Sequence, residues 1–194
     1  MADGRGHTER VLIRSEGPGD LDAIRAVHAA AFRDKNHPDR VPDEVELVDQ
    51  LRNSTAWLPT LSIVAALDGS VVGHCLTTRA HIGDAQVLGL GPIGVLPEHQ
   101  RGGVGSALVE ATIATADERG EVLIGLLGDP QFYRRFGFVV STELHIAPSE
   151  PSWARFFQVR PLAAFRAGVT GVLRYAAPFE ALESEQLGPA REAR

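Results

Sequence analysis

The sequence is poor in cysteine and contains no long apolar run. Cys75 is the one cysteine among 194 residues, which excludes an intramolecular disulfide framework and favours a reducing compartment. No apolar stretch reaches membrane-spanning length, and residues 1–9 are charged and lack the apolar core of a signal peptide. We therefore expect a cytoplasmic protein that is neither exported nor held in a membrane.

Lysine is scarce as well, and acidic residues outnumber basic ones by 25 to 19. The formal net charge of −6 at pH 7 argues against a protein whose surface binds nucleic acid. Lys35 is the one lysine and lies in the polar run 33–40, where a solvated side chain is expected rather than Schiff-base chemistry. The seven histidines show no tight ligand spacing such as H-E-x-x-H, so no metal site is predicted.

The length and the 44% content of hydrophobic residues suffice for one buried core. We expect a flexible N-terminus over residues 1–8, a single domain over 9–182 and a polar C-terminal tail over 183–194.

Periodicity in the first half predicts a short strand, two helices and a hairpin. A strand at 9–15 precedes a helix that begins at Asp20 as the N-cap, and a second helix begins at Pro42. The β-rich runs 61–67 and 70–77 are separated by Asp68-Gly69 alone, which is the two-residue signal of a type I′ hairpin.

The second half predicts a long strand at 86–96, then a glycine-rich loop and a helix that ends at Gly120. The apolar run 121–127 is typical of a central strand, and a short helix follows it and stops at Gly137. Further strands are expected at 138–140, 156–162 and 172–176. For the long helix, the expected inner face consists of Val104, Leu108, Ala111 and Thr115.

The glycine-rich loop is the most informative segment. Gly102, Gly103 and Gly105 let the backbone turn tightly and bring several N–H groups to one anion, to which the following helix adds its positive end. This pattern favours a pyrophosphate, although an ordinary tight turn is the alternative. The nearby sequence from Gly89 to Gly94 has the form G-x-G-x-x-G, but no helix follows it, which disfavours dinucleotide binding.

Two blocks carry a family resemblance. The segment from Pro97 to Gly105 resembles the acyl-CoA pyrophosphate motif of the GNAT N-acetyltransferases, Q/R-x-x-G-x-G/A, and the segment from Leu127 to Phe138 resembles the GDPxYYxRFGF block of the YhbS-like branch. Element order extends the resemblance over roughly residues 10–140. It implies an α/β fold of the GNAT type, with a mixed, mainly antiparallel central sheet flanked by helices on both faces.

The resemblance implies an enzyme that transfers an acetyl group from acetyl-CoA to a primary amine of a small molecule or peptide, by direct attack on the thioester. The strand residues Ile93, Gly94 and Val95 would meet the thioester and pantetheine. The residues that would anchor the pyrophosphate are Gln100, Arg101, Gly102, Gly103, Val104, Gly105 and Ser106. The alternative is an acyl-CoA-binding sensor or scaffold without turnover.

The resemblance also assigns Tyr133 to the CoA sulfur, where its hydroxyl would protonate or stabilise the leaving thiolate. The competing interpretation is a core aromatic beside Phe132 and Phe136. Phe132 stands where the branch often has tyrosine.

The base for the amine stays open among His37, His74, His81, Glu98 and a chain of water molecules. Arg134 and Arg135 would meet phosphates or form a solvated face. The aromatic residues Trp153, Phe156 and Phe157 would line an acceptor pocket, cover the core, or contact a second copy in a homodimer formed through the C-terminal strands.

Overall fold

A computed structural model describes residues 11–186, with side chains described to 182. Its strands are β1 (Leu12–Ser15), β2 (Trp57–Leu67), β3 (Ser70–Ile82), β4 (Ala85–Val95), β5 (Leu123–Leu127), β6 (Val139–Val140), β7 (Ile146–Pro148), β8 (Phe157–Pro161) and β9 (Gly171–Arg174). Its α-helices are α1 (Leu21–Ala31), α2 (Asp43–Arg52), α3 (Val104–Glu118), α4 (Pro130–Tyr133) and α5 (Ala177–Gln186). Residues 1–10 and 187–194 lie outside the described part.

The strands form one mixed sheet with the order β1-β2-β3-β4-β5-β8-β6, while β9 pairs with both β3 and β7. Only the β4–β5 and β7–β9 pairs are parallel among the described strands. The predicted mixed, mainly antiparallel sheet is therefore confirmed. The hairpin prediction also holds, because Asp68 and Gly69 join β2 to β3 with positive φ angles of 48° and 84°, as a type I′ turn requires.

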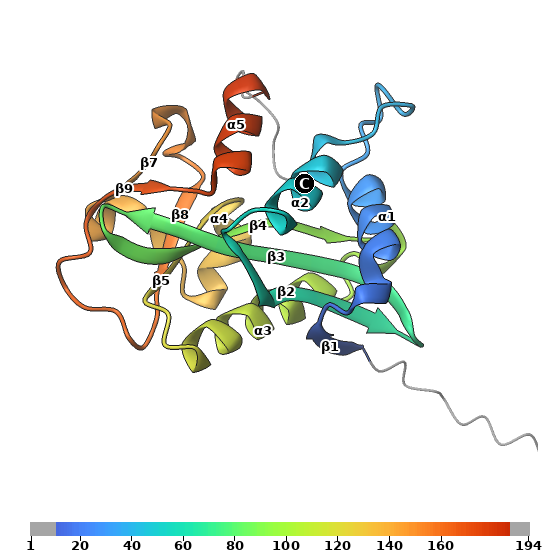
Figure 1. The fold of residues 1–194 in the computed structure, drawn as a ribbon, viewed down its shortest axis with the longest axis horizontal. Coiled ribbons are helices and arrows are strands. Elements are labelled where there is room, and N and C mark those ends of the chain that lie inside the picture. Colours follow the sequence, from blue (N-terminus) through green and yellow to red (C-terminus); the bar gives the residue numbers. More distant parts are fainter. Residues whose placement is uncertain (1–10, 187–194) are drawn as a thin grey trace, which may run out of the picture.

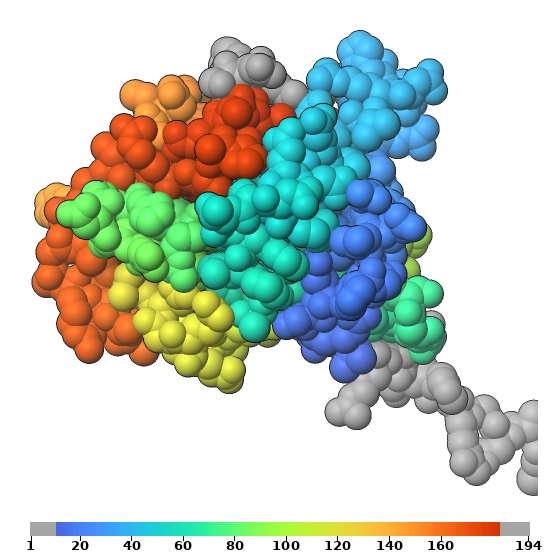
Figure 2. All heavy atoms as spheres, viewed as in Figure 1, coloured from blue at the N-terminus to red at the C-terminus, as the bar shows by residue number. Residues whose placement is uncertain are grey.

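Helices cover both faces of the sheet (Figure 1). Helices α1, α2 and α5 lie on one face, and α3 and α4 lie on the other. In Figure 2 the surfaces of α1 and α2 adjoin, with α5 next to α2. Each face has its own core: Leu47, Val48 and Leu51 of α2 are buried in the first, and Val104 and Leu108 of α3 in the second, the last two as predicted.

Two local predictions were only partly right. Ala111 and Thr115 of α3 are only partly buried, whereas the fully buried positions include Val109, Thr112 and Ala116. The helix is apolar around most of its circumference, so its pattern did not fix its rotation. Asp20 is the N-cap of α1, as predicted, but its side chain makes no capping hydrogen bond, because its carboxylate pairs with Arg14 at 2.6 and 2.9 Å and accepts the Gly17 N–H.

The C-terminal part differs most from expectation. β7 and α5 were not predicted, and α5 continues to Gln186, past the expected domain end at 182. The predicted limits of the domain and of the flexible N-terminus stay predictions. Trp153 and Phe157 are buried in the core, which settles two of the three aromatic positions. No helix within the described residues is both long and apolar enough to cross a membrane.

Candidate active site

The glycine-rich loop connects the end of β4 to the first turn of α3. A short 3-10 helix at Pro97–His99 follows β4, and the Gln100 side chain then donates to the Val95 carbonyl at 3.0 Å, which ties the loop to the strand. Arg101 and Gly103 both adopt left-handed backbone conformations, with φ angles of 61° and 89°. Gly103 is the N-cap of α3, and a Cβ there would meet no atom within 4 Å.

The N–H groups at this helix start are available to an external anion. No side chain caps α3. The first backbone hydrogen bond of α3 runs from the Ala107 N–H to the Gly103 carbonyl. The N–H groups of Val104, Gly105 and Ser106 precede that bond and have no intrahelical partner. A helix start with unpartnered donors and no acidic residue in its first turn is an electrostatically favourable site for a phosphate.

Arg135 adds a positive charge beside these donors. Its guanidinium donates to the Ser106 hydroxyl at 3.2 Å and stacks on the rings of Phe132 and Phe136, with 4.3 and 4.9 Å to their centroids. Both arginines are exposed, and of the two it is Arg135 whose side chain contacts the loop.

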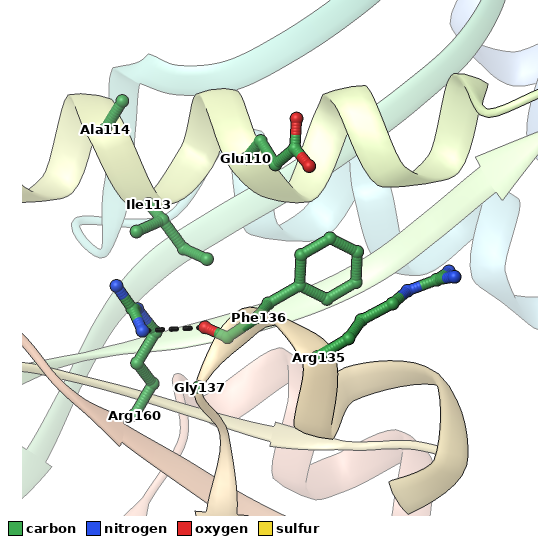
Figure 3. A pocket seen from close by; sticks show the side chains of 7 residues that line it. All are labelled: Glu110, Ile113, Ala114, Arg135, Phe136, Gly137 and Arg160. Atoms are coloured by element: carbon green, nitrogen blue, oxygen red, sulfur yellow. Dashed lines mark hydrogen bonds between the residues drawn. The ribbon is translucent and has the colours of Figure 1, made fainter.

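Arg135 also lines a pocket of about 470 Å³ between α3 and the turn after α4 (Figure 3). Glu110 of α3 and Arg160 of β8 contribute charged groups to its lining, and Arg160 donates to the Phe136 carbonyl at 2.6 Å. The pocket thus lies along α3 beyond the loop, and Arg135 borders both.

Strands β4 and β5 separate next to the loop. Their parallel pairing covers Leu88 to Leu90 of β4 against Ile124 to Leu126 of β5. In the described structure Ile93, Gly94 and Val95 keep their antiparallel partners on β3 but have none on β5. The edge of β4 that is left unpaired can therefore bind an extended ligand as a further strand would.

Tyr133 lies on the α3 face of the sheet, at the end of α4. Asp129 caps this short helix by accepting the Gln131 N–H, and Gly137 ends the turn after it with a φ of 82°. The Tyr133 side chain is 7% exposed, and burial followed by the neighbouring Cys75 raises the pKa of its phenol. The hydroxyl is therefore protonated at neutral pH. Cys75 is fully buried, and burial raises the pKa of its thiol to about 11, which argues against a nucleophilic role.

The candidate bases are scattered. His37 is exposed and pairs with Asp34, His81 lies exposed at the far end of β3, and Glu98 is exposed on the turn after β4. His74 is fully buried, and both of its ring nitrogens lie within hydrogen-bond distance of other side chains. None of the four is a side chain open to an acceptor beside Gly94. Within the described residues, no group of three or more His, Cys, Asp and Glu side chains could hold a metal ion.

Comparison with known proteins bears directly on this arrangement. The acetyltransferase (GNAT) domain family matches residues 59–140. The uncharacterized N-acetyltransferase YhbS of Escherichia coli is 31% identical over 169 residues, which are 85% of this chain and 96% of that protein. The chain belongs to the GNAT acetyltransferase family.

Two solved GNAT structures resemble the whole fold. The E. coli YhbS structure in complex with CoA has a TM-score of 0.80 at 28% identity, covering 97% of both chains. A GNAT family acetyltransferase from Brucella melitensis in complex with acetyl-CoA has a TM-score of 0.69 at 34% identity, covering 88% of this chain and 99% of that one. The chain is accordingly an N-acetyltransferase by family, as the two sequence blocks predicted.

Sequence reasoning did not single out one buried polar residue beside the candidate site. His28 of α1 is fully buried, and its Nδ1 would lie 3.2 Å from a Cβ at Gly94 of β4. The available signal was its position on the apolar stripe of α1, four residues after Ile24, where a histidine interrupts an otherwise apolar face.

Proposed function

We propose that this protein uses acetyl-CoA as the acyl donor and acetylates a primary amine. The observation that carries the proposal is the continuity of the uncapped amides at the start of α3 with the unpaired edge of β4. Amides at a helix start suit a diphosphate, and a free strand edge suits the amide groups of a pantetheine arm. Relatives solved with CoA and acetyl-CoA support this assignment.

In this proposal the loop residues bind the donor chiefly through their backbone. The N–H groups of Val104, Gly105 and Ser106 bind the diphosphate, and Arg135 lends charge from the side. Arg101, Gly102 and Gly103 shape the turn, and Gln100 holds it against the end of β4. Gly103 is suited to its position because it adopts a positive φ without placing a side chain in the phosphate path.

The reactive part of the site lies at Ile93, Gly94 and Val95. Backbone N–H groups of this strand polarise the thioester carbonyl, and the amine attacks its carbon. The C–N bond forms, the C–S bond breaks, and the electron pair leaves with the sulfur. Tyr133 donates its phenolic proton to that sulfur or stabilises the thiolate by a hydrogen bond. Because the phenol is protonated at neutral pH, it can act as a donor here.

The acceptor is a primary amine of a small molecule or peptide. A thiol-release assay tests the proposal, with acetyl-CoA as donor and a panel of spermidine, an aminoglycoside, a lysine-containing peptide and a free peptide N-terminus. Release of CoA that depends on one of these amines, with the acetylated product seen by mass spectrometry, is the expected result. Absence of CoA binding in calorimetry would overturn the proposal at its first step.

A further inference from the structure

A buried chain of polar side chains runs from α1 along one face of the sheet to the segment after β1. His28 Nε2 lies 2.8 Å from His74 Nδ1, and His74 Nε2 lies 2.9 Å from the Ser62 hydroxyl. Ser62 bonds the Glu16 carboxylate, which also accepts two hydrogen bonds from Arg52, at 2.7 and 2.9 Å. His28, His74 and Ser62 are all fully buried. The elements involved lie far apart in sequence, so the fold assembles this chain.

The position of each proton follows from the Glu16 end. Burial raises the pKa of Glu16, but the nearby His74 ring and the hydrogen bonds from Arg52 and Ser62 outweigh it and lower the pKa to about 2. Glu16 is therefore ionised at neutral pH and can only accept, so Ser62 donates to it. The Ser62 oxygen then accepts from His74 Nε2–H.

The position of the proton on His28 follows from the same assignment of donors and acceptors. Burial lowers the pKa of both histidines, so each imidazole is neutral and carries one proton. His74 carries its proton on Nε2, so its Nδ1 accepts from His28 Nε2–H. His28 Nδ1 is left with a lone pair. That atom is buried and has no hydrogen-bond partner among the described residues.

The lone pair on His28 Nδ1 faces Gly94 of β4. Helix α1 crosses β3 and β4 on the face opposite α3 (Figure 1), and an added Cβ at Gly94 would lie 3.2 Å from His28 Nδ1. Gly94 is paired with His74 on β3, so both imidazoles gather beside the same residue of β4. Pairing between β4 and β5 has already ended there.

We propose that His28 is the proton acceptor for the amine in acetyl transfer, and that His74, Ser62 and Glu16 position it and stabilise the charge it gains. This inference rests on the proposed function. As the C–N bond forms, the nitrogen becomes acidic and gives one proton to His28 Nδ1 through an intervening water. His28 passes its Nε2 proton to His74 Nδ1, while the CoA sulfur receives a separate proton at the Tyr133 side.

The charged groups around His28 and His74 suit this transfer of a proton. Glu16 and Asp20 favour a proton on His74, Arg52 of α2 opposes one on either histidine, and β4 contributes no titratable side chain at Ile93, Gly94 or Val95. At its outer end, Glu16 and Arg52 line a pocket of about 270 Å³ together with Trp57 and Pro59. The proton that His28 accepts therefore has a route to solvent through His74, Ser62 and Glu16.

Nitrogen-15 NMR of the intact protein tests the proton positions without any turnover. Long-range couplings within the imidazoles at pH 7.5 are expected to show both histidines protonated on Nε2 and free of a proton on Nδ1. A proton on His28 Nδ1 would overturn the relay, whatever the outcome of the amine assay.

Variants test the catalytic part, with the best amine of the panel as acceptor. Gln at position 28 can still donate to His74 but cannot take up a proton, so His28→Gln is expected to lower kcat about 100-fold while KM for acetyl-CoA changes less than threefold. His81→Gln removes an exposed histidine and is the matched control, with wild-type kcat expected. A loss of less than tenfold in His28→Gln would overturn the assignment.

The pH profile separates a relay from a merely structural network. Glu16→Gln removes the carboxylate that stabilises the protonated histidines, so the acid limb of kcat/KM should move to lower pH. An unmoved limb in a folded Glu16→Gln protein would contradict the relay, and Ser62→Ala repeats the test should that variant not fold. If no amine of the panel is acetylated, the proposed function fails, while the NMR experiment still decides the relay geometry.

Discussion

The ring of Tyr133 packs directly onto the Cα of Gly128. A Cβ at Gly128 would lie 3.0 Å from Tyr133 Cδ2 and 3.3 Å from its Cζ, and closer still to Cε2. Gly128 follows β5 and Tyr133 ends α4, so the residue that closes the central strand also sets the orientation of the phenol.

Gly128→Ala should therefore displace the Tyr133 ring. Because the new methyl group and the ring cannot occupy the same space, we expect kcat for acetyl transfer to fall at least tenfold and the unfolding free energy to fall by about 1–3 kcal/mol. Steady-state kinetics and urea denaturation measure the two effects. Gly19→Ala is the control, since a Cβ there meets nothing within 4 Å. Unchanged kinetics in Gly128→Ala would show that the ring position does not matter.

Tyr133→Phe removes the hydroxyl and keeps the ring. We expect kcat to drop about 10- to 100-fold, because the leaving sulfur loses its proton donor, while the affinity for CoA stays within twofold. Stopped assays of thiol release and calorimetry distinguish the two quantities. Tyr175→Phe changes the other tyrosine, which packs against Phe179 in the opposite core, and should behave as wild type. Equal kcat values for both variants would remove Tyr133 from the mechanism.

The buried histidines make the stability depend on pH. Burial holds the pKa of His28 and His74 below the value of 6.5 expected when unfolded, so the folded state binds fewer protons. The unfolding free energy should be level above about pH 6.5 and fall below it, by about 1–2 kcal/mol between pH 7.5 and 5.5. Urea titrations across this range provide the measurement.

His28→Gln should flatten this dependence, whereas His81→Gln should keep the slope of the wild type. Parallel stability curves for the wild type and His28→Gln would mean that His28 does not resist protonation in the folded state.

Arg135 and Arg134 are neighbours with different expected roles. Arg135→Gln should weaken CoA binding about tenfold, because the charge beside Ser106 is lost, and Arg134→Gln should change it less than twofold. Titrations at low and high salt should show the difference shrinking as salt rises. An equal effect of both substitutions would indicate only a general charge effect.

The sequence predicted the elements whose signals are local. Asp68-Gly69 specified its hairpin, and Gly120 and Gly137 marked the ends of a helix and a turn because each adopts a positive φ. The three-residue strand β7 carries no periodicity and exists through its pairing with β9, from Ile146 opposite Gly171 to Pro148 opposite Leu173. Such a strand depends on contacts distant in sequence.

The residues of the candidate site likewise differ in how far local sequence signals predict them. The glycine-rich loop is one continuous segment with a motif, so its residues could be predicted from the sequence. The network of Glu16, Ser62 and His74 with His28 is assembled from four separate segments, and no spacing rule connects them. His74 was a predicted candidate base, but only the packing of α1 over β4 brings its partner His28 next to Gly94.

Calorimetric titration of CoA into Gly103→Asp and Gly103→Asn tests the central claim, that the amides at the start of α3 bind the diphosphate. Both side chains have nearly the same shape and tolerate the left-handed conformation of this position, and they differ by one negative charge. We predict that Gly103→Asn stays within about fivefold of wild-type affinity and that Gly103→Asp binds CoA at least tenfold more weakly than Gly103→Asn. Equal affinity of the two variants for CoA would contradict the account.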